Sequence, residues 1–395
     1  MRIKILHVVG DSKFGGASYG ILRLARHWKS QSWAVQILST DADLQRLAES
    51  EGVEVLPIDV IWRATRPLKD LWGLWKLYRF LRVSEYTLVH THTTKASFIG
   101  RLAATLAGVP VIIHTAHGFA FHEGSPWWKK LACTVLDRIA SIGCKKVIAV
   151  SHFHRQWGTR LGIADSRKII AIPNGIPDPA KCDASEIARV RSHWGVKPGQ
   201  TVILTPGRLA PEKGLEDLID AVAQLDPNVR SNLLVLIAGD GALYESLHAR
   251  ISRLKLNDHI RLLGFQNNVS SLLCAADLIV LPTWREGLSI ALLEAMAQGC
   301  AIVTTTIGSN LEVTRNGEGA SLVAPGATRQ LAGEIARLAA NQKVRQELGC
   351  RAREIYLSHY TLDRTLHEYH KLYKELFEEF DHAQSVSPLL SSTHR

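Results

Sequence analysis

The sequence predicts an α/β protein of two doubly wound, Rossmann-like domains, each built on a parallel β-sheet with helices on both faces. Apolar strand-like segments alternate with helical patterns along the chain, and this alternation stops and restarts once, near residue 174. The strand-like segments are almost continuously apolar, which is typical of parallel sheets buried on both faces. A chain of 395 residues is also too long for one ordinary hydrophobic core. Two such domains facing each other would form an interdomain cleft for a ligand, between the carboxyl ends of their strands.

The turn-rich run Asn174-Gly-Ile-Pro-Asp-Pro179 separates the two sets of expected strands, so we expect domains over residues 1–178 and 179–358. A long helix of mixed charge is expected near Thr361–Asp381, in a segment 359–382 that packs back on the N-terminal domain. The last residues, 383–395, are expected to form a disordered tail. The expected strands are Ile3–Val9, Ala34–Ser39, Val53–Ile58, Leu88–Thr91, Val111–Thr115, Val147–Ser151, Ile169–Ile172, Thr201–Gly207, Leu233–Ala238, Ile260–Leu263, Leu278–Leu281, Ala301–Thr305 and Gly319–Val323, with helices such as Tyr19–Lys29 and Ala96–Leu106 between them.

The composition, with 46% hydrophobic and 21% charged residues, is that of a folded globular protein. No apolar run reaches the roughly 18 residues that a bilayer span requires. The N-terminus indicates a first strand rather than a signal peptide, because its apolar part is too short. The six cysteines are scattered without a C-x-x-C pair. This argues against a disulfide framework or a structural zinc site, and we expect a cytoplasmic protein.

The formal charge of +10 belongs to the N-terminal half. Residues 1–180 hold 24 Lys and Arg against 13 Asp and Glu, and the rest holds 23 against 24. A basic N-terminal half could bind nucleic acid or an anionic membrane surface. Residues 61–82 carry six cations and one acid among three tryptophans, and Pro126-Trp-Trp-Lys-Lys130 is a second aromatic and basic spot. The 61–82 segment is either a peripheral membrane contact or a helix packed on the N-terminal sheet, and the two can coexist.

The strongest single feature is the pair Glu286 and Glu294, in a run that follows the apolar strand Leu278–Leu281 and opens a helix. A strand, a Gly-bearing turn and a helix N-terminus form a phosphate-binding corner. Glu286 is expected in the loop and Glu294 about two helical turns later, so the two carboxylates cannot share a proton.

Cations and glycines follow several other strands. Arg208 and Lys213 lie in the loop after Thr201–Gly207, where two fixed cations could neutralise a departing diphosphate, or form a solvated surface pair. Gly15-Gly16 follows the first strand but lacks the G-x-G-x-x-G dinucleotide pattern, so it is a phosphate contact or a plain turn. Gly239-Asp240-Gly241 favours a tight turn.

Histidines occur in pairs at 90 and 92, 114 and 117, and 152 and 154. No Asp, Glu or Cys constellation accompanies them, so we expect no metal site. His117, which follows a strand and precedes Gly118, is the main candidate for a substrate hydrogen bond or an acid–base group. The alternative is a histidine that is satisfied by nearby backbone.

Together these spaced motifs resemble the retaining, GT-B-fold glycosyltransferases of family 4, also called glycosyltransferase group 1. The likeness extends over nearly the whole chain, and the Glu286–Glu294 spacing combined with the Arg208–Lys213 loop is its most specific part. The motifs Thr91-His-Thr93 and His114-Thr-Ala-His-Gly-Phe-Ala-Phe-His122 resemble the branch that acts on polyprenyl-linked sugars in surface polysaccharide assembly. Ser309-Asn310 departs from the family's Gly-rich turn, which leaves the geometry near Glu312 open. The other matches are Gly15-Gly16, His117-Gly118, Ser151, Asn174-Gly175-Ile176, Gly207-Arg208, Glu212-Lys213-Gly214, Gly239-Asp240-Gly241, Pro282, Glu286-Gly287, Glu294-Ala295 and Ile307–Gly326.

The resemblance implies a catalytic set of His117, Arg208, Lys213 and Glu286. Arg208 and Lys213 would stabilise the leaving nucleoside diphosphate, Glu286 would bind the transferred sugar, and His117 would contact the sugar or the acceptor. The other implied contacts are the Gly16 amide to the donor diphosphate, the Leu288 and Ser289 amides to the distal phosphate, Glu294 to the ribose, Val269 near the base, and Gly15, Asn174, Gly207, Gly239 and Gly287 elsewhere along the substrate.

The same resemblance implies sugar transfer from a UDP- or GDP-linked donor to a glycan or lipid-linked saccharide, with retention of anomeric configuration and without a metal or other cofactor. Fixed cations and a helix N-terminus can stabilise the leaving group by themselves. Three alternatives stay open: a nucleotide-sugar 2-epimerase of the same fold, a catalytically silent sugar-nucleotide-binding subunit, and a nucleic-acid binder. No recognisable motif supports nucleic acid, so we expect none as a partner.

Overall fold

The computed structural model describes residues 3–10, 15–62, 66–119, 121 and 124–391, with the backbone alone at residue 94 and over 383–391. The chain divides into two compact units, one of Met1–Asn174 with Asp363–Arg395 and one of Gly175–Leu362. The division falls slightly before the boundary expected after residue 178. The last helix belongs to the first unit.

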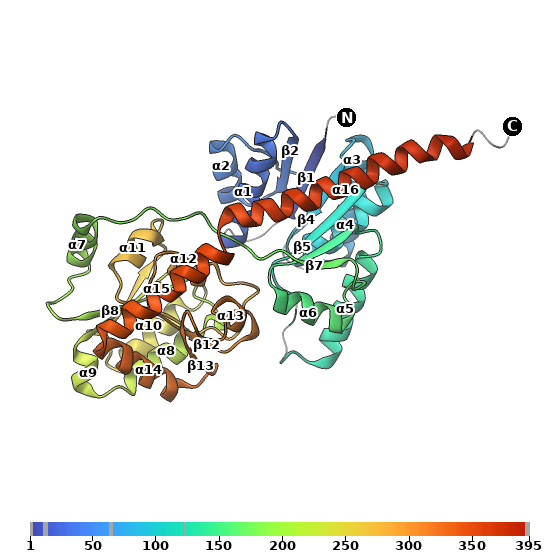
Figure 1. Ribbon diagram of the computed structural model, residues 1–395. Helices are drawn as coiled ribbons and strands as arrows, with labels where there is room; N and C mark the ends of the chain where they lie inside the picture. Colours follow the sequence, from blue (N-terminus) through green and yellow to red (C-terminus); the bar gives the residue numbers. More distant parts are fainter. Residues whose placement is uncertain (1–2, 11–14, 63–65, 120, 122–123, 392–395) are drawn as a thin grey trace. The chain divides into compact units, whose positions relative to one another are not determined.

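The N-terminal unit is built on a seven-stranded parallel sheet with the order β3-β2-β1-β4-β5-β6-β7 (Figure 1). The chain starts in the middle, builds toward one edge, and then crosses back to build toward the other, which defines a doubly wound sheet. Its strands are β1 Lys4–Gly10, β2 Ala34–Ser39, β3 Glu54–Leu56, β4 Leu88–Thr91, β5 Val111–Ala116, β6 Lys146–Ala149 and β7 Ile169–Ala171.

Both faces of this sheet are buried, because successive residues of each strand point to opposite sides. In β1, Ile5 and Val9 belong to one apolar core, and Leu6 and Val8 belong to the other. The first core is covered by α1, α2 and α16, and the second by α3 and α4. The helices of this unit are α1 Gly16–Ser30, α2 Ala42–Ser50, α3 Pro67–Val83, α4 Thr94–Ala107, α5 Trp127–Ala140, α6 His152–Leu161 and α16 Leu362–Ser391.

The terminal helix α16 packs on the N-terminal sheet through Tyr369, Tyr373 and Phe377. In Figure 1 it is the long red helix that crosses the strands of this unit. Helix α16 continues to Ser391, so it includes residues 383–391 of the segment expected to form a disordered tail. A helix propagates far more easily than it nucleates, so a well-packed start can extend into polar sequence. The expected tail residues 392–395 lie outside the described residues.

The C-terminal unit repeats the design with six parallel strands in the order β10-β9-β8-β11-β12-β13. Its strands are β8 Thr201–Pro206, β9 Leu233–Ala238, β10 Ile260–Gly264, β11 Leu278–Leu281, β12 Ile302–Thr305 and β13 Ser321–Val323. Its helices are α7 Ala184–His193, the 3₁₀ turn η1 Pro211–Lys213, α8 Leu215–Ala223, α9 Pro227–Ser231, α10 Tyr244–Arg253, α11 Val269–Ala275, α12 Ile290–Ala297, α13 Gly308–Val313, α14 Thr328–Ala340 and α15 Gln342–His359.

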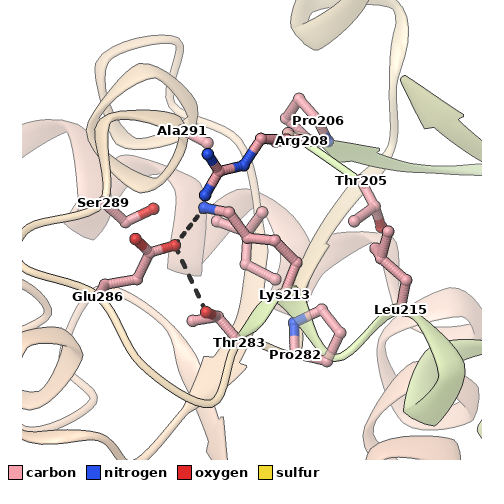
Figure 2. A pocket seen from close by; sticks show the side chains of 12 residues that line it. Thr205, Pro206, Arg208, Lys213, Leu215, Pro282, Thr283, Glu286, Ser289 and Ala291 are labelled. Atoms are coloured by element: carbon pink, nitrogen blue, oxygen red, sulfur yellow. Dashed lines mark hydrogen bonds and ion pairs between the residues drawn. The ribbon is translucent and has the colours of Figure 1, made fainter. Parts of the chain in front are cut away.

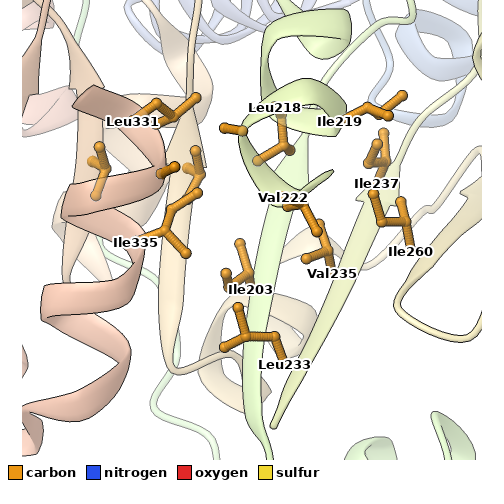
Figure 3. Packing of buried hydrophobic residues seen from close by; sticks show 14 of the residues in the cluster. Ile203, Leu218, Ile219, Val222, Leu233, Val235, Ile237, Ile260, Leu331 and Ile335 are labelled. Carbon is orange, nitrogen blue, oxygen red and sulfur yellow. The ribbon is translucent and has the colours of Figure 1, made fainter. Parts of the chain in front are cut away.

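The core of this unit fixes the strands that carry the candidate site. Figure 3 shows Ile203 of β8 and Val235 of β9 packed beneath Val222 of α8, with Ile335 of α14 beside them. All four side chains are completely buried. Burial of such a side chain contributes about 1.5–3 kcal/mol, so the carboxyl ends of β8 and β9 start from rigid strands.

One cysteine pair corrects the sequence analysis. Cys182 and Cys274 form a disulfide with their Cα atoms 6.3 Å apart, although 92 residues separate them. The two cysteines are far apart along the chain, but α7 and α11 pack together in space and bring the two thiols within bonding range. Cys133, Cys144, Cys300 and Cys350 are free.

Within the described part of the chain, no helix combines the length and the apolar character that crossing a membrane requires.

Candidate active site

A small pocket lies in the C-terminal unit at the carboxyl ends of β8 and β11 (Figure 2). Parallel sheets bind ligands at this edge because loops and helix N-termini converge there. The lining residues are Thr205, Pro206, Gly207, Arg208, Lys213, Leu215, Leu281, Pro282, Thr283, Glu286, Ser289 and Ala291.

The loop from β8 to α8 carries both cations of the pocket and is held by close backbone packing. Gly214 ends η1 with a left-handed φ of 63°, and a Cβ at this position would collide with the Pro282 carbonyl oxygen. At the end of β9, a Cβ on Gly239 would collide with the Gly207 carbonyl oxygen. These glycines therefore let the loop lie directly against its neighbours, which places Lys213 beside β11.

Lys213 and Glu286 form an ion pair across the pocket, through Nζ and Oε1. Figure 2 shows the lysine stem reaching from the β8 loop to the carboxylate. The Thr283 hydroxyl lies 3.4 Å from the same Oε1 and also donates a 2.8 Å hydrogen bond to the Glu212 carbonyl oxygen. Both charged side chains are mostly buried. A cation from one loop and a carboxylate from another are thus held together by a hydroxyl that contacts both loops.

Arg208, the second cation, is half exposed and pairs with Glu212 at 2.5 Å. Burial works to raise the pKa of Glu212, but a hydrogen bond with its own backbone amide and the Arg208 charge outweigh burial and lower it. Glu212 is therefore ionised at neutral pH and holds the guanidinium at the pocket. The Glu212 backbone also fixes the β11 loop, because its carbonyl oxygen accepts from the Trp284 amide at 2.9 Å.

Helix α12 begins at the pocket, with Ser289 as its N-cap accepting a hydrogen bond from the Leu292 amide. The first backbone amides of a helix have no partner within it, so this end attracts anions. Beside it, the Ser309 hydroxyl donates to the Glu286 carbonyl oxygen at 3.1 Å. Asn310 donates to Thr304 at 2.9 Å and so anchors α13. Ser309-Asn310, which departs from the resembled family's Gly-rich turn, therefore braces the Glu286 loop.

The structure gathers five of the expected site residues around one pocket. These are Gly207, Arg208, Lys213, Glu286 and Ser289. The turn between Glu286 and Ser289 holds Gly287 and Leu288, directly before α12. Three expected residues do not line the pocket: Gly239 supports the β8 loop, Glu294 lies inside α12, and Val269 is the first residue of α11.

Two sequence families match the chain. The family described as Glycosyltransferase Family 4 matches residues 14–178, and the family described as Glycosyl transferases group 1 matches residues 186–355. The chain belongs to these glycosyltransferases. It is 27% identical over 318 residues to the UDP-Gal:alpha-D-GlcNAc-diphosphoundecaprenol alpha-1,3-galactosyltransferase of Escherichia coli, covering 80% of this chain and 82% of that one.

One further sequence relative and two solved structures of the GT-B fold are also similar to the chain. The Staphylococcus aureus capsular polysaccharide biosynthesis glycosyltransferase CapM is 22% identical over 382 residues, which are 95% of this chain and 98% of CapM. The crystal structure of Anabaena HepE in complex with UDP-glucose superposes with a TM-score of 0.83 at 24% identity, over 94% of this chain and all of HepE. WaaG, a glycosyltransferase involved in lipopolysaccharide biosynthesis, gives a TM-score of 0.75 at 17% identity, over 92% of this chain and 98% of WaaG.

Thr283 is a pocket residue of the glycosyltransferase that was not predicted from the sequence. It lies between Pro282 and Trp284 and its hydroxyl contacts two loops. A threonine just after a buried strand is common and therefore carries little signal. The available hint was its position three residues before Glu286, within the most specific motif.

Four expected site residues belong to the N-terminal unit of the glycosyltransferase. Gly15 caps α1 and Gly16 begins it, while Asn174 is the last residue of the unit before the division. His117 follows β5, and its Nε2 lies 3.3 Å from Nδ1 of His92. Burial lowers the pKa of His117 to about 4, so the ring is neutral at pH 7. Residues 11–14, which precede Gly15, and His122, which ends the expected histidine motif, lie outside the described residues.

Proposed function

We propose that this glycosyltransferase moves a sugar from a uridine diphosphate sugar to a lipid-linked saccharide, with retention of anomeric configuration, in assembly of a cell-surface polysaccharide. The observation that carries the proposal is the meeting of Lys213, Arg208 and Glu286 beside the N-terminus of α12. The names of two similar proteins support the chemical class. One includes a UDP-galactose donor and a diphosphoundecaprenol-linked acceptor, and HepE was crystallised with UDP-glucose.

The charges match what the reaction needs. Cleavage of the bond between the anomeric carbon and the phosphate oxygen leaves negative charge on the diphosphate and positive charge on the sugar. Lys213, Arg208 and the free amides at the start of α12 would stabilise the diphosphate, and Glu286 would bind the sugar. We propose that no metal or other cofactor takes part, since these fixed positive groups already meet the leaving group.

The electron pair of the broken bond stays on the leaving phosphate oxygen, and the acceptor hydroxyl forms a new bond to the anomeric carbon on the same face. The hydroxyl proton passes to that phosphate oxygen, so the products are a glycoside and a protonated nucleoside diphosphate. No protein carboxylate has to act as a nucleophile. Glu286 and Glu294 would then be two contacts on one donor, one to the sugar and one to the ribose hydroxyls.

The remaining roles complete the proposed donor site. The Gly16 amide, with Gly15 before it, would contact the diphosphate, and Leu288 and Ser289 would bind the distal phosphate after the Gly287 turn. Gly207 and Gly239 would let the backbone approach the ligand closely. Val269 would lie near the base, and His117 and Asn174 would contact the sugar or the acceptor.

The test is a panel of UDP- and GDP-linked sugars incubated with the pure protein and a bacterial lipid extract. We expect diphosphate release that depends on the lipid, together with a labelled lipid whose new linkage has the anomeric configuration of the donor by NMR. An inverted linkage would overturn retention. Conversion of the donor without lipid would instead favour the 2-epimerase, and no turnover with any donor would favour a silent binding subunit.

We also propose that α3 and α5 rest on an anionic membrane, where such an acceptor would be found. In α3, Gly73, Leu77 and Leu81 are buried, whereas Trp72 and Trp75 are exposed. Helix α3 therefore packs on its unit through one side and exposes aromatic side chains on the other. A packed helix that also offers a surface for a membrane was one of the expectations from the sequence. In the segment before α3, residues 63–65 lie outside the described residues.

Helix α5 carries a larger apolar surface than the sequence analysis expected. The helix begins with Trp127 and Trp128, which are 75% and 61% exposed. A stripe of exposed apolar side chains continues from them along the helix. The stripe is Trp128, Leu131, Val135, Ile139 and, just past the helix, Ile142. Both α5 and α3 pack on α4, and cations lie among the aromatics, with Lys76 stacked 4.8 Å from the Trp72 ring. Exposed tryptophans with neighbouring lysines favour a membrane interface.

Vesicle flotation tests this surface. We expect the protein to float with vesicles of phosphatidylglycerol and phosphatidylcholine, and a double Trp127→Ser, Trp128→Ser variant to float less. Leu357→Ser, at a half-exposed leucine of α15 in the other unit, is the matched control and should float like the parent. Equal flotation of the tryptophan variant, or a salt-dependent shift of nucleic acid in a gel, would refute the membrane role of this face.

A further inference from the structure

Three histidines form a hydrogen-bonded chain in the N-terminal unit. His7 Nδ1 lies 3.0 Å from His92 Nε2, and His92 Nδ1 lies 3.3 Å from His117 Nε2. His7 and His92 are buried. The chain runs from inside the sheet to the residues just beyond the carboxyl ends of β4 and β5, which is the edge where parallel sheets bind ligands.

The strand register explains why these rings meet. His7 in β1 pairs with His90 in β4, and β4 is also the neighbour of β5. Residues two apart on a strand point to the same face of the sheet. His90 and His92 therefore lie on one side, and Thr115 and His117 lie on that same side. Helix α16 covers that side with Tyr369 and Tyr373.

His90 lies next to the chain but is not a link in it. Its Nδ1 lies 2.7 Å from the Tyr373 hydroxyl, and its Nε2 lies 2.7 Å from the Thr115 hydroxyl. Thr115 in turn lies 2.9 Å from the Tyr369 hydroxyl. Both ring nitrogens of His90 are therefore occupied by hydroxyls that connect the sheet to α16.

The two ends of the chain are open. His7 Nε2 and His117 Nδ1 are buried, and neither has a hydrogen-bond partner among the described residues. Burial lowers the pKa of His7 to about 3 and that of His117 to about 4, and it lowers the pKa of His92 well below the usual value. All three rings are thus neutral at pH 7 and each carries one N–H.

Neutral rings joined in series must order their protons together. Two hydrogen bonds among three rings require every N–H to point the same way along the chain. The tautomers of His7, His92 and His117 are therefore coupled: once the proton position of one ring is set, the positions in the other two follow.

We infer that His7 and His92 are positioning residues that hold His117 by its Nε2 and leave Nδ1 as the nitrogen that meets an oxygen of the donor sugar or the acceptor. The inference rests on the proposed function for the identity of that ligand. His117 then acts as a neutral hydrogen-bonding group of fixed direction. An unpartnered buried nitrogen is unfavourable, and a ligand oxygen would satisfy it on binding.

A metal ion is the competing explanation for the same cluster. One ring nitrogen from each of His7, His90 and His92 can lie within 4.8 Å of the others. Both ring nitrogens of His90 and of His92 already have hydrogen-bond partners, so a metal ion there would have to displace one hydroxyl from His90 and break one hydrogen bond of the chain at His92. Because those bonds are already formed with good distances, the geometry favours the hydrogen-bonded chain.

A mutant cycle on sugar transfer tests the inference. We expect His92→Ala to lower kcat at least tenfold, and the double variant His92→Ala, His117→Ala to be no slower than His117→Ala alone, because residues that act through one another are not additive. The matched control is His114→Ala, since His114 is buried on the opposite face and bonds to Thr91 and Ser97. The control should lose similar stability yet keep kcat within a few-fold. Independent, multiplying effects of His92 and His117 would overturn the inference.

Ring nitrogen NMR gives a readout that needs no activity. With ¹⁵N-histidine, the wild-type His117 ring should show one neutral tautomer, and His92→Ala should turn it into a mixture. An unchanged His117 signal would overturn the inference, and so would stoichiometric Zn²⁺ binding that shifts the His7 and His92 nitrogens. Absence of transfer by the wild type would count against the proposed function alone, since the tautomer is still measured.

Discussion

Lys213 and Glu286 neutralise each other across the pocket although they come from loops that follow different strands. Each side chain of the pair therefore holds the other in place within the pocket. A diphosphate that binds at the start of α12 would compete with Glu286 for Lys213 and free the carboxylate for the sugar hydroxyls. One pair would thus couple recognition of the phosphates to recognition of the sugar.

Replacing Lys213 tests the leaving-group role. Lys213→Met keeps the aliphatic stem and removes the charge, so kcat should fall on the order of 100-fold, as when one preorganised donor to a developing anion is removed. Released diphosphate measures the rate. Lys343→Met, which removes a surface lysine paired with Glu347 at 4.0 Å, is the control and should leave kcat unchanged. Near-normal transfer by Lys213→Met would refute the assignment.

Thr283 should matter more for activity than for folding. Thr283→Val removes the hydroxyl that orients Glu286, and we expect kcat to fall about tenfold, equivalent to one lost hydrogen bond. The Glu212 carbonyl keeps the Trp284 amide as a donor, so loss of the threonine hydrogen bond should lower the free energy of unfolding by about 0.5–1.5 kcal/mol.

The control for Thr283 is Thr314→Val. Thr314 is also buried and donates at 2.8 Å to a carbonyl oxygen, that of Asn310, but it does not line the pocket. Both variants should lose similar stability in urea unfolding. Equal activity in the two variants would show that the Thr283 hydroxyl does not position Glu286.

The sequence predicted this fold because strand and helix periods alternate so regularly. Every expected strand is present, and the two sheet orders follow from the doubly wound pattern. The loop cations and Glu286 could be predicted because polar residues at the carboxyl end of an apolar strand have few structural uses. Thr283 and Ser309 could not, since a hydroxyl is informative only when its partner in another loop is known.

Contacts between distant segments were the harder part. The histidine chain joins residues up to 110 positions apart, and only the register of β1, β4 and β5 shows that they share a face. The Cys182–Cys274 pair was missed for the same reason. Spacing motifs detect sites formed by neighbours in sequence, whereas these two features are formed by neighbours in a sheet or between helices.

Removing the disulfide should lower stability without abolishing activity. It closes a loop with 92 residues of separation, and constraining the unfolded chain in this way is typically worth about 2–4 kcal/mol. Cys182→Ser should lower the midpoint of urea unfolding measured without reductant, and reductant should do the same to the parent. Cys350→Ser, at an exposed free cysteine, is the control. Mass spectrometry that finds both thiols free in the purified protein would contradict this prediction.

Stability should fall between pH 7.5 and pH 5.5 because several histidines are buried in the neutral form. Burial lowers the pKa of His7 to about 3 and that of His154 to about 4, while the unfolded chain protonates histidine near its ordinary pKa of about 6.5. Below about pH 6.5 the unfolded state therefore binds protons that the folded state does not, and the loss continues as pH falls toward the folded pKa values.

Each such histidine lowers the free energy of unfolding by about 1.4 kcal/mol at pH 5.5, so His7 and His154 together account for about 3 kcal/mol. His90, His92 and His114 act in the same direction, because burial also lowers their pKa values. Urea unfolding at the two pH values measures the difference, and His154→Gln should reduce it by about 1.4 kcal/mol relative to the parent. His193→Gln replaces an exposed histidine at the end of α7 and should leave the difference unchanged. If the parent were equally stable at both pH values, these histidines would have to be charged in the folded protein. That result would also refute the neutral hydrogen-bonded chain from His7 to His117.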